Sequence, residues 1–266
     1  SKNAFEQLST SPKVAIVGIT PSGGLLIPEL LNFIEEAIEA GLDIVNGLHE
    51  FLEEKPHLVE AARRRGVKLH DIRKPRSKMD LHFWSGEITR VRAPRIAVMG
   101  TDCAVGKRTT TRWLMDACNQ AGIKTEMIFT GQTGWMQSRH DYGFLFDSTP
   151  NDFVSGELED AIVRCDRECS PDLILLEGQS SLRNPSGPCG SEFLCSAMAK
   201  GVILQHVPGR KTLHFTNASL PMPDIQGDLE LIKVYGARTL ALTISSEGLD
   251  SAELEDIRIA HQSSLG

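Results

Sequence analysis

The sequence lacks the features of a membrane, secreted or metal-binding protein. No apolar run approaches the roughly 18 residues that a helix needs to span a bilayer, and no secretory signal pattern is present. The six cysteines include no paired C-x-x-C spacing, and the eight histidines form no metal-ligand pattern. We therefore expect a cytoplasmic protein with reduced thiols, no membrane partner and no resident metal ion.

Positive charge is also scarce, because the 266 residues carry a formal net charge of −7. A general nucleic-acid binder gains affinity by neutralising phosphates over a broad surface, so we expect no nucleic-acid partner. The local exception is the basic stretch 63–78, which we interpret as solvated helix and loop surface rather than as a site for an anionic ligand.

Internal repeats, low-complexity segments and a dinucleotide fingerprint are absent as well. The glycines of Gly18–Gly24 do not have the G-x-G-x-x-G spacing, and a turn explains them better. The length and the hydrophobic content of 41% suit one large or two small globular domains with buried cores.

The first part of the chain alternates short apolar strands with helices. Strands are predicted at 13–18, 42–45 and 67–72, and helices at 27–38 and 56–66. This βαβαβ order predicts a parallel sheet with right-handed crossovers. Turn-forming residues between 75 and 94 mark an exit from this unit, so we place the boundary near residue 90, with domains 1–90 and 91–266.

The second part repeats the alternation and completes an α/β fold of two parallel-sheet domains. Strands are predicted at 95–99, 125–130, 172–176, 202–206 and 238–244, and helices at 107–120, 153–168, 191–200, 225–235 and 251–262. The loop 131–150 is long for such a fold, and loops of this length are usually functional or mobile. The sequence ends soon after its last helix, where an α/β fold usually continues into another strand, so we expect terminal segments to be missing from it.

The most informative segment is Ile96–Thr111. An apolar strand runs into a glycine-bounded turn, and a lysine and hydroxyl residues then open a helix. The N–H groups of such a turn, the positive end of the helix and Lys107 together form a cradle for phosphate. However, Gly100 and Gly106 lie six residues apart rather than five, and Arg108 stands where a magnesium-binding Ser or Thr is usual. The loop therefore indicates bound phosphate more strongly than ATP hydrolysis.

Cofactor binding is predicted for this loop, the start of its helix and one residue after the next strand. Thr109 and Thr110 are displaced candidates for the magnesium hydroxyl, and Asp102 is a candidate cap of the loop or of the helix. The candidate cofactor-binding residues are Gly100, Thr101, Asp102, Cys103, Ala104, Val105, Gly106, Lys107, Arg108, Thr109, Thr110 and Gln132.

Polar loops follow four of the predicted strands, whose carboxyl ends share one edge of a parallel sheet. Glu177 stands where nucleotide enzymes keep an acid that binds magnesium; the alternative is a buried carboxylate that is hydrogen-bonded to the phosphate loop. Arg210 presents a fork suited to a carboxylate or phosphate, or is an ordinary surface arginine.

Two histidines, His49 and His206, also stand at predicted strand ends. Either is a candidate general base, although a histidine in such a position is more often a satisfied structural group. The candidate catalytic residues are Lys107, Glu177, Arg210 and His49.

The phosphate loop resembles that of a known enzyme group. Gly100–Lys107 is similar to the loop of dethiobiotin synthetase and its relatives, which share the six-residue glycine spacing, and Glu177-Gly178 is similar to their acidic Glu-Gly turn. Those enzymes use ATP and magnesium to activate a carboxyl-type substrate. The sequence departs from their pattern at Arg108.

A second resemblance covers nearly the whole chain, to a bacterial family long considered of unknown function. Its members pair a Rossmann-like N-terminal domain with a phosphate-loop C-terminal domain, and some are assigned as D-glutamate N-acetyltransferases that feed D-glutamate breakdown. The motifs that carry the resemblance are Asn46–His49, Asp71–Pro75, Gly100–Thr110, Thr130–Gly134, Glu177–Gln179 and Pro208–Arg210.

This resemblance implies acetyl-CoA as cofactor, with its phosphates in the loop, and D-glutamate as the small-molecule substrate. Two alternatives stay open: an ATP- and magnesium-dependent ligase or kinase for a small carboxylate, and a nucleotide-sensing module without enzymatic activity. A homo-oligomer is also expected, because the apolar faces of α/β domains often extend into a partner.

Overall fold

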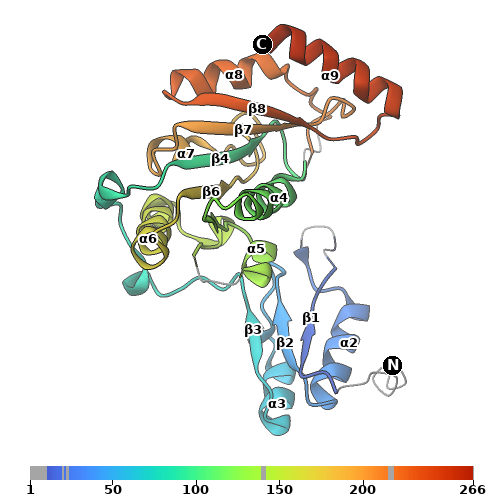
Figure 1. The fold of residues 1–266 in the computed structure, drawn as a ribbon. Helices are drawn as coiled ribbons and strands as arrows, with labels where there is room; N and C mark the ends of the chain where they lie inside the picture. Colours follow the sequence, from blue (N-terminus) through green and yellow to red (C-terminus); the bar gives the residue numbers. More distant parts are fainter. Residues whose placement is uncertain (1–10, 20, 22–23, 139–141, 215–218, 266) are drawn as a thin grey trace. The chain divides into compact units, whose positions relative to one another are not determined.

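The computed structural model describes residues 11–19, 21, 24–138, 142–214 and 219–265. The chain forms two compact units, Ser1–Arg76 and Ser77–Gly266 (Figure 1). Both contain an all-parallel sheet, which confirms the predicted class of two parallel-sheet α/β domains. No helix in these described ranges is long and apolar enough to cross a membrane. The turn expected at Gly18–Gly24 lies partly outside them.

The first unit is a three-stranded sheet in the order β1-β2-β3. Its elements follow the predicted βαβαβ order: β1 (Val14–Ile16), α2 (Pro28–Glu39), β2 (Asp43–Asn46), the 3-10 helix η2 (Leu52–Glu54), α3 (Pro56–Arg65) and β3 (Leu69–Asp71). Ile34 and Ile38 of α2 are buried in one core with Ile44 of β2 and Leu58 of α3. Gly66 ends α3 in the left-handed region, with a φ of 68°, which favours glycine.

The arginine and lysine side chains of the basic stretch 63–78 are exposed, as expected, with the exception of Arg73, which is buried and donates to the carbonyl oxygen of Gly47. Arg64 forms an ion pair with Glu39, and Lys74 forms one with Glu53, and all four side chains are exposed. Such exposed pairs are typical of a helix and loop surface in contact with water.

The second unit is a five-stranded parallel sheet in the order β5-β6-β4-β7-β8, so β4 is its central strand (Figure 1). The strands are β4 (Arg95–Gly100), β5 (Thr125–Ile128), β6 (Leu173–Glu177), β7 (Gly201–His206) and β8 (Arg238–Ile244). The helices are α4 (Lys107–Gln120), α5 (Gln132–Gln137), α6 (Asn151–Cys169), α7 (Ser191–Cys195), α8 (Ile225–Val234) and α9 (Ser251–Leu265), with 3-10 helices η3 (Lys78–Asp80), η4 (Glu87–Arg90) and η5 (Phe146–Ser148).

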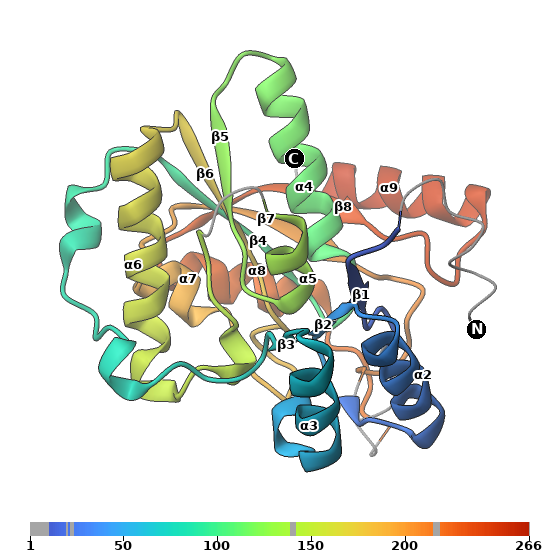
Figure 2. The same cartoon turned by 90° about the horizontal axis from the view of Figure 1, so that it is seen from below.

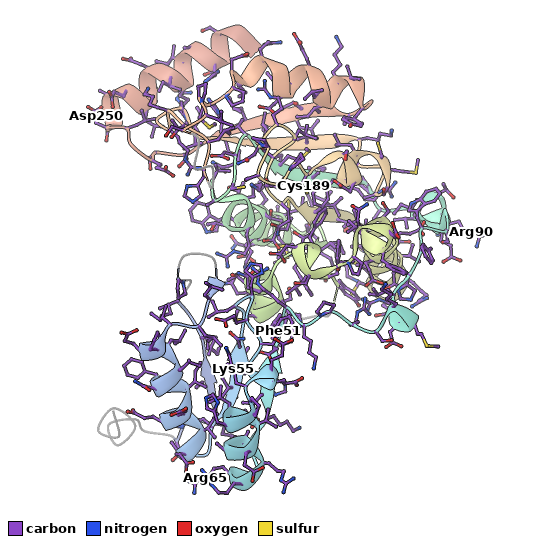
Figure 3. The ribbon with its side chains drawn as sticks, turned by 180° about the vertical axis from the view of Figure 1, so that it is seen from behind. Phe51, Lys55, Arg65, Arg90, Cys189 and Asp250 are labelled. Atoms are coloured by element: carbon purple, nitrogen blue, oxygen red, sulfur yellow. The ribbon has the colours of Figure 1, made fainter. Side chains whose placement is uncertain are left out.

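The core of this unit lies between the sheet and α6. Ala97 and Met99 of β4 pack in one cluster with Leu158 of α6 and Phe193 of α7. Cys189, labelled in Figure 3, lies in the same cluster, and burial raises the pKa of its thiol. All six cysteines of the chain are free.

The helix α4 packs against β4, β5 and β6 (Figure 2). It begins directly after the loop that leaves the central strand, as predicted for 107–120. Its first turn therefore stands at the carboxyl edge of the sheet, where ligands of open parallel sheets bind.

Two predicted segments differ in the structure. The helix expected at 191–200 ends at Cys195, and Met198 then takes a left-handed φ of 53°, which stops helical continuation. The long loop 131–150 contains α5 and η5, which the sequence pattern did not indicate.

The two units divide between Arg76 and Ser77, earlier than the predicted boundary near residue 90. The segment after Ser77 is attached to α6: the amides of His82 and Ile88 donate to the carboxylates of Glu157 and Glu159. Gly156 allows this approach, since a Cβ there would lie 1.9 Å from the carbonyl oxygen of His82. Figure 3 shows Arg90, at the end of η4, beside the second unit to which this segment belongs.

Candidate functional site

The loop between β4 and α4 has the backbone of a phosphate cradle. Ala104 and Gly106 both adopt left-handed conformations, with φ values of 52° and 98°. No side chain caps the start of α4. The first amides of a helix have no partner within the helix itself, so they can bind an anion at this position.

Lys107 lies inside this loop, with 7% of its surface exposed. Its ammonium nitrogen donates to the carbonyl oxygens of Asp102 at 2.7 Å and Ser180 at 2.6 Å. Carbonyl oxygens position the ammonium without neutralising its charge, and burial lowers the pKa of Lys107 to about 8. The positive charge therefore stays available to a bound anion.

Glycines make room for the lysine side chain. A Cβ on Gly100 would lie 2.8 Å from a methyl carbon of Val105 and 3.1 Å from the Lys107 nitrogen. A Cβ on Gly178 would lie 2.3 Å from the carbonyl oxygen of Val98. The glycines at these positions are thus required by close approach of the backbone.

Asp102 is the buried centre of the loop, with none of its surface exposed. Its carboxylate accepts hydrogen bonds from Arg210 Nη1 at 2.8 Å, Asn184 Nδ2 at 2.7 Å and the amide of His214 at 2.8 Å. Burial alone would raise the pKa of Asp102, but these hydrogen bonds, and one from the Cys103 amide, lower it. Of the two predicted alternatives, Asp102 therefore caps the loop and does not cap α4.

Arg210 differs from its expected role as a fork for a ligand. Nη1 also donates to the carbonyl oxygen of Cys103 at 2.8 Å, and Nε and Nη2 contact the carboxylate of Glu247 at 3.1 and 2.7 Å. Two carboxylates already occupy the guanidinium edges, which are suited to bidentate contacts. The structure thus gives Arg210 the position of a residue that holds the loop in shape.

Glu177 ends β6, with 5% of its surface exposed. Its Oε2 accepts a hydrogen bond from the amide of Thr130 at 3.0 Å, so its partner lies after β5 and not in the phosphate loop. Burial raises the pKa of Glu177 to about 7, although the Thr130 amide and the charges of Arg108 and Lys107 oppose this shift. Within the described ranges, no group of three or more His, Cys, Asp or Glu residues is arranged to hold a metal ion.

The hydroxyl of Thr110 is engaged by the protein. It donates to Gln205 Oε1 at 2.6 Å, and Thr243 donates to the same oxygen at 2.8 Å. Thr109 is exposed on α4, and Gln132 is half-buried as the first residue of α5. Of the two threonines, only Thr109 keeps a hydroxyl without a partner in the described part of the chain.

Arg108 carries a donor that the protein does not satisfy. Its Nη1 is enclosed and has no hydrogen-bond partner among the described residues. A buried donor without a partner is costly, so such a group points to a ligand or an ordered water.

The two histidines have different environments. His206 is buried, its Nδ1 lies 3.2 Å from the Thr101 hydroxyl, and burial, together with His261, lowers its pKa to about 4. It is a neutral structural group. His49 belongs to the first unit, is exposed after β2, and donates its amide to the carbonyl oxygen of Gly24 at 2.9 Å.

Two cavities adjoin the start of α4. One of about 520 Å³ is lined by Val105, Gly106, Thr109, Thr110 and Trp113, among others. The second, of about 460 Å³, is lined by Arg108, Thr109, Arg112, Trp113, Asp116 and Gln137.

Sequence reasoning missed Asn184, Arg112 and Trp113. Asn184 lies far from the loop in sequence, and only the fold brings it to Asp102. Arg112 and Trp113 carried a usable signal, because helical spacing of three to four residues places them beside Arg108 and Thr109.

Comparison with known proteins covers both units. Residues 2–75 match a family described as "Domain of unknown function (DUF1611_N) Rossmann-like domain", and residues 82–266 match "Domain of unknown function (DUF1611_C) P-loop domain". A crystal structure of a DUF1611 family protein from Anabaena variabilis is similar, with a TM-score of 0.83 and 26% identity over 94% of this chain and 73% of that chain.

Two curated relatives are named D-glutamate N-acetyltransferase. The one from Pseudoalteromonas sp is 31% identical over 244 residues, which cover 83% of this chain and 69% of the relative. The one from Tritonibacter scottomollicae is 33% identical over 178 residues, 66% of this chain and 50% of the relative. With both of its units matched, this chain belongs to the DUF1611 family, which joins a Rossmann-like N-terminal domain to a P-loop C-terminal domain.

Proposed function

We propose that this chain is an N-acetyltransferase that transfers the acetyl group of acetyl-CoA to the amino group of D-glutamate. The names of the two curated relatives support the reaction and the acceptor. The observation that carries the cofactor assignment is the uncapped start of α4 beside the buried Lys107 ammonium, an arrangement suited to a pyrophosphate.

In this proposal the loop binds the pyrophosphate of CoA. The amides of the loop and of the first turn of α4 donate to phosphate oxygens, and Lys107 supplies a full charge. Each hydrogen bond to a charged group contributes about 1.5–3 kcal/mol. Asp102 and Arg210 act on the loop by holding its backbone, without touching the ligand.

Glu177 sets the charge of the cradle in this proposal. With a pKa of about 7 it exchanges its proton near neutral pH, and its charge acts on the same space as those of Lys107 and Arg108. We do not assign it as the base, because the pantetheine arm of CoA carries the thioester away from the phosphates.

The transfer itself needs no metal. The ammonium of the acceptor first loses a proton to the base, and the nitrogen lone pair then forms a C–N bond with the thioester carbonyl carbon. The nitrogen of the adduct loses its second proton as the C–S bond breaks, and CoA leaves as a thiolate that takes up a proton. A hydrogen-bond donor at the developing oxyanion lowers the barrier.

ATP and magnesium are the alternative cofactors. Two observations favour acetyl-CoA. Arg108 occupies the position of the magnesium-binding hydroxyl, and of the two displaced threonines only Thr109 keeps a hydroxyl without a partner among the described residues, because that of Thr110 is used by Gln205. A phosphate ligand that binds without a metal fits this donor set better than a magnesium–nucleotide complex does.

The test is a thiol-release assay with acetyl-CoA across D- and L-amino acids, with ATP in parallel reactions. We expect free thiol with D-glutamate, at equal rates in EDTA and in magnesium. ADP release that depends on a small carboxylate, without thiol release, contradicts the proposal and favours a ligase or kinase. A ligand-induced change of assembly without any turnover contradicts it in favour of a nucleotide-sensing module.

A further inference from the structure

We infer that the cavity of about 460 Å³ beside the first turns of α4 binds the 3′-phosphoadenosine end of CoA, with Arg108 and Arg112 on the 3′-phosphate and Trp113 against the adenine. The inference rests on the proposed function, since it assumes that CoA occupies the phosphate loop. It adds a subsite that distinguishes CoA from nucleotides without a 3′-phosphate.

The positions of the two arginines follow from the helix. Arg108 and Arg112 are four residues apart on α4, so they lie on the same face, and both line the cavity. Arg108 directly follows Lys107, whose ammonium lies in the phosphate loop. The two arginines therefore stand one helical turn apart at the start of α4, directly after the lysine of the loop.

Neither arginine forms an ion pair with another residue in the described ranges, although the charge of Arg108 acts on Glu177. Nη1 of Arg108 is enclosed and lacks any partner there. Nη1 of Arg112 donates to the carbonyl oxygen of Gln137 at 3.0 Å, which orients the guanidinium and leaves its charge unpaired. Asp116 also lines the cavity and repels an anion, so it restricts a bound phosphate to the end nearest the loop.

Trp113 supplies an apolar surface at the same place. Its side chain is 72% exposed and lines both this cavity and the neighbouring one of about 520 Å³. Indole is a large flat surface on which a nucleobase stacks, and this contact is tolerant of base identity. An exposed tryptophan that lines one cavity with two arginines and another with the phosphate loop therefore matches an adenosine that carries a further phosphate.

The chemistry of CoA explains why the cavity suits its 3′-phosphate. The ribose carries the 5′-pyrophosphate and the 3′-phosphate only a few bonds apart, so a second set of cations next to the loop meets the second anion. The carboxylates of an acceptor amino acid must lie near the thioester, at the far end of the pantetheine arm. ATP has its phosphates in a single chain and leaves this pair of arginines unmatched.

Calorimetric titration of the full chain tests the subsite, with CoA, 3′-dephospho-CoA and ADP as ligands. A charged hydrogen bond corresponds to at least about a tenfold change in affinity, so we expect the wild type to bind CoA at least tenfold more tightly than 3′-dephospho-CoA. Arg112→Gln should remove most of this preference and leave 3′-dephospho-CoA binding within about twofold. Arg108→Gln should also remove most of the preference. Trp113→Ala should weaken the binding of CoA and of 3′-dephospho-CoA by a similar factor.

The matched control is Arg167→Gln, at an exposed arginine near the end of α6. It should retain the full preference, and thermal unfolding should show that every variant is folded. Equal dissociation constants of the wild type for CoA and 3′-dephospho-CoA overturn the inference, as does a preference that survives in both arginine variants. The inference is also overturned if Arg112→Gln raises the KM for D-glutamate but keeps the preference for CoA over 3′-dephospho-CoA, because the cavity would then bind the acceptor.

The two proposals fail in distinguishable ways. If thiol release from acetyl-CoA and from its 3′-dephospho analogue is equally efficient, the transferase activity stands and only the subsite is wrong. If neither CoA form binds, both proposals are wrong.

Discussion

The carboxylate of Asp102 and the guanidinium of Arg210 form a buried ion pair, with 2.8 Å between Oδ2 and Nη1. The pair joins the phosphate loop to the segment after β7, and Glu247 holds the other edge of the same guanidinium. Asn184, after β6, donates to the same carboxylate, so groups that follow β6, β7 and β8 together fix the loop.

The first prediction concerns this pair. Asp102→Ala leaves Arg210, Asn184 and the His214 amide without their shared acceptor, and breaking a buried pair in this way costs about 3 kcal/mol of unfolding free energy. Chemical denaturation measures the loss. The control is Glu255→Ala, which removes an exposed partner of Arg258 and should leave the unfolding free energy nearly unchanged. Similar losses in the two variants would contradict the assigned role of Asp102.

The second prediction concerns Lys107. Lys107→Ala should weaken CoA binding by at least about 1.5 kcal/mol, because a charged hydrogen bond to phosphate is lost. The fold should be retained, since only two carbonyl oxygens lose a donor. Lys124→Ala is the control, because Lys124 also donates to a carbonyl oxygen but precedes β5, at the opposite edge of the sheet. Unchanged CoA affinity in Lys107→Ala would show that the loop does not bind the cofactor.

The third prediction is a fall in CoA affinity as the pH rises from 6 to 9. Glu177 is neutral below its pKa of about 7 and becomes an anion above it, which repels phosphate. Lys107 is charged below its pKa of about 8 and loses that charge above it. Both changes have the same sign, so affinity should decrease in two steps. Glu177→Gln should remove the lower step only, and a wild-type affinity that is flat or rises over this range would contradict the assignment.

The fourth prediction separates backbone strain from ligand contact. Gly106→Val introduces a branched side chain at a φ of 98°, so stability should fall by about 1–2 kcal/mol, and the added methyl groups should also block the cradle. Gly122 has a φ of 82° after the other end of α4, and no atom lies near its missing Cβ. Gly122→Val should cost a similar stability without any loss of CoA affinity. Equal binding by the two variants would show that no ligand approaches Gly106.

Local patterns were sufficient to predict much of the fold. The helix at 107–120 and the strand at 238–244 were predicted with the bounds that the structure shows, because glycines and apolar periodicity mark their ends directly. By contrast, α5 was missed because Gly131 and Gly134 look like turn residues. A Cβ on Gly134 would lie 2.6 Å from both Phe129 Cβ and Glu177 Oε2, so this glycine serves a close contact instead.

The site was predicted as a set of strand ends but not as a network. Two of its hydrogen bonds, Arg210–Glu247 and Thr110–Gln205, depend on the order of the strands. They form because β7 lies beside β4, and β8 lies beside β7. This strand order is not encoded in local spacing. The sequence therefore placed these residues at the carboxyl edge of the sheet but could not predict which residues they would bond.

The oxygen of Gln205 that accepts from both Thr110 and Thr243 has a consequence for ligand recognition. These hydrogen bonds, with the Thr101–His206 and Thr130–Glu177 contacts, connect α4 and the neighbouring strands at the carboxyl edge of the sheet. Because these side chains are already ordered in the protein, ligand binding costs little of the protein's conformational entropy. Removing one of these contacts, for example with Gln205→Ala, should therefore weaken CoA binding.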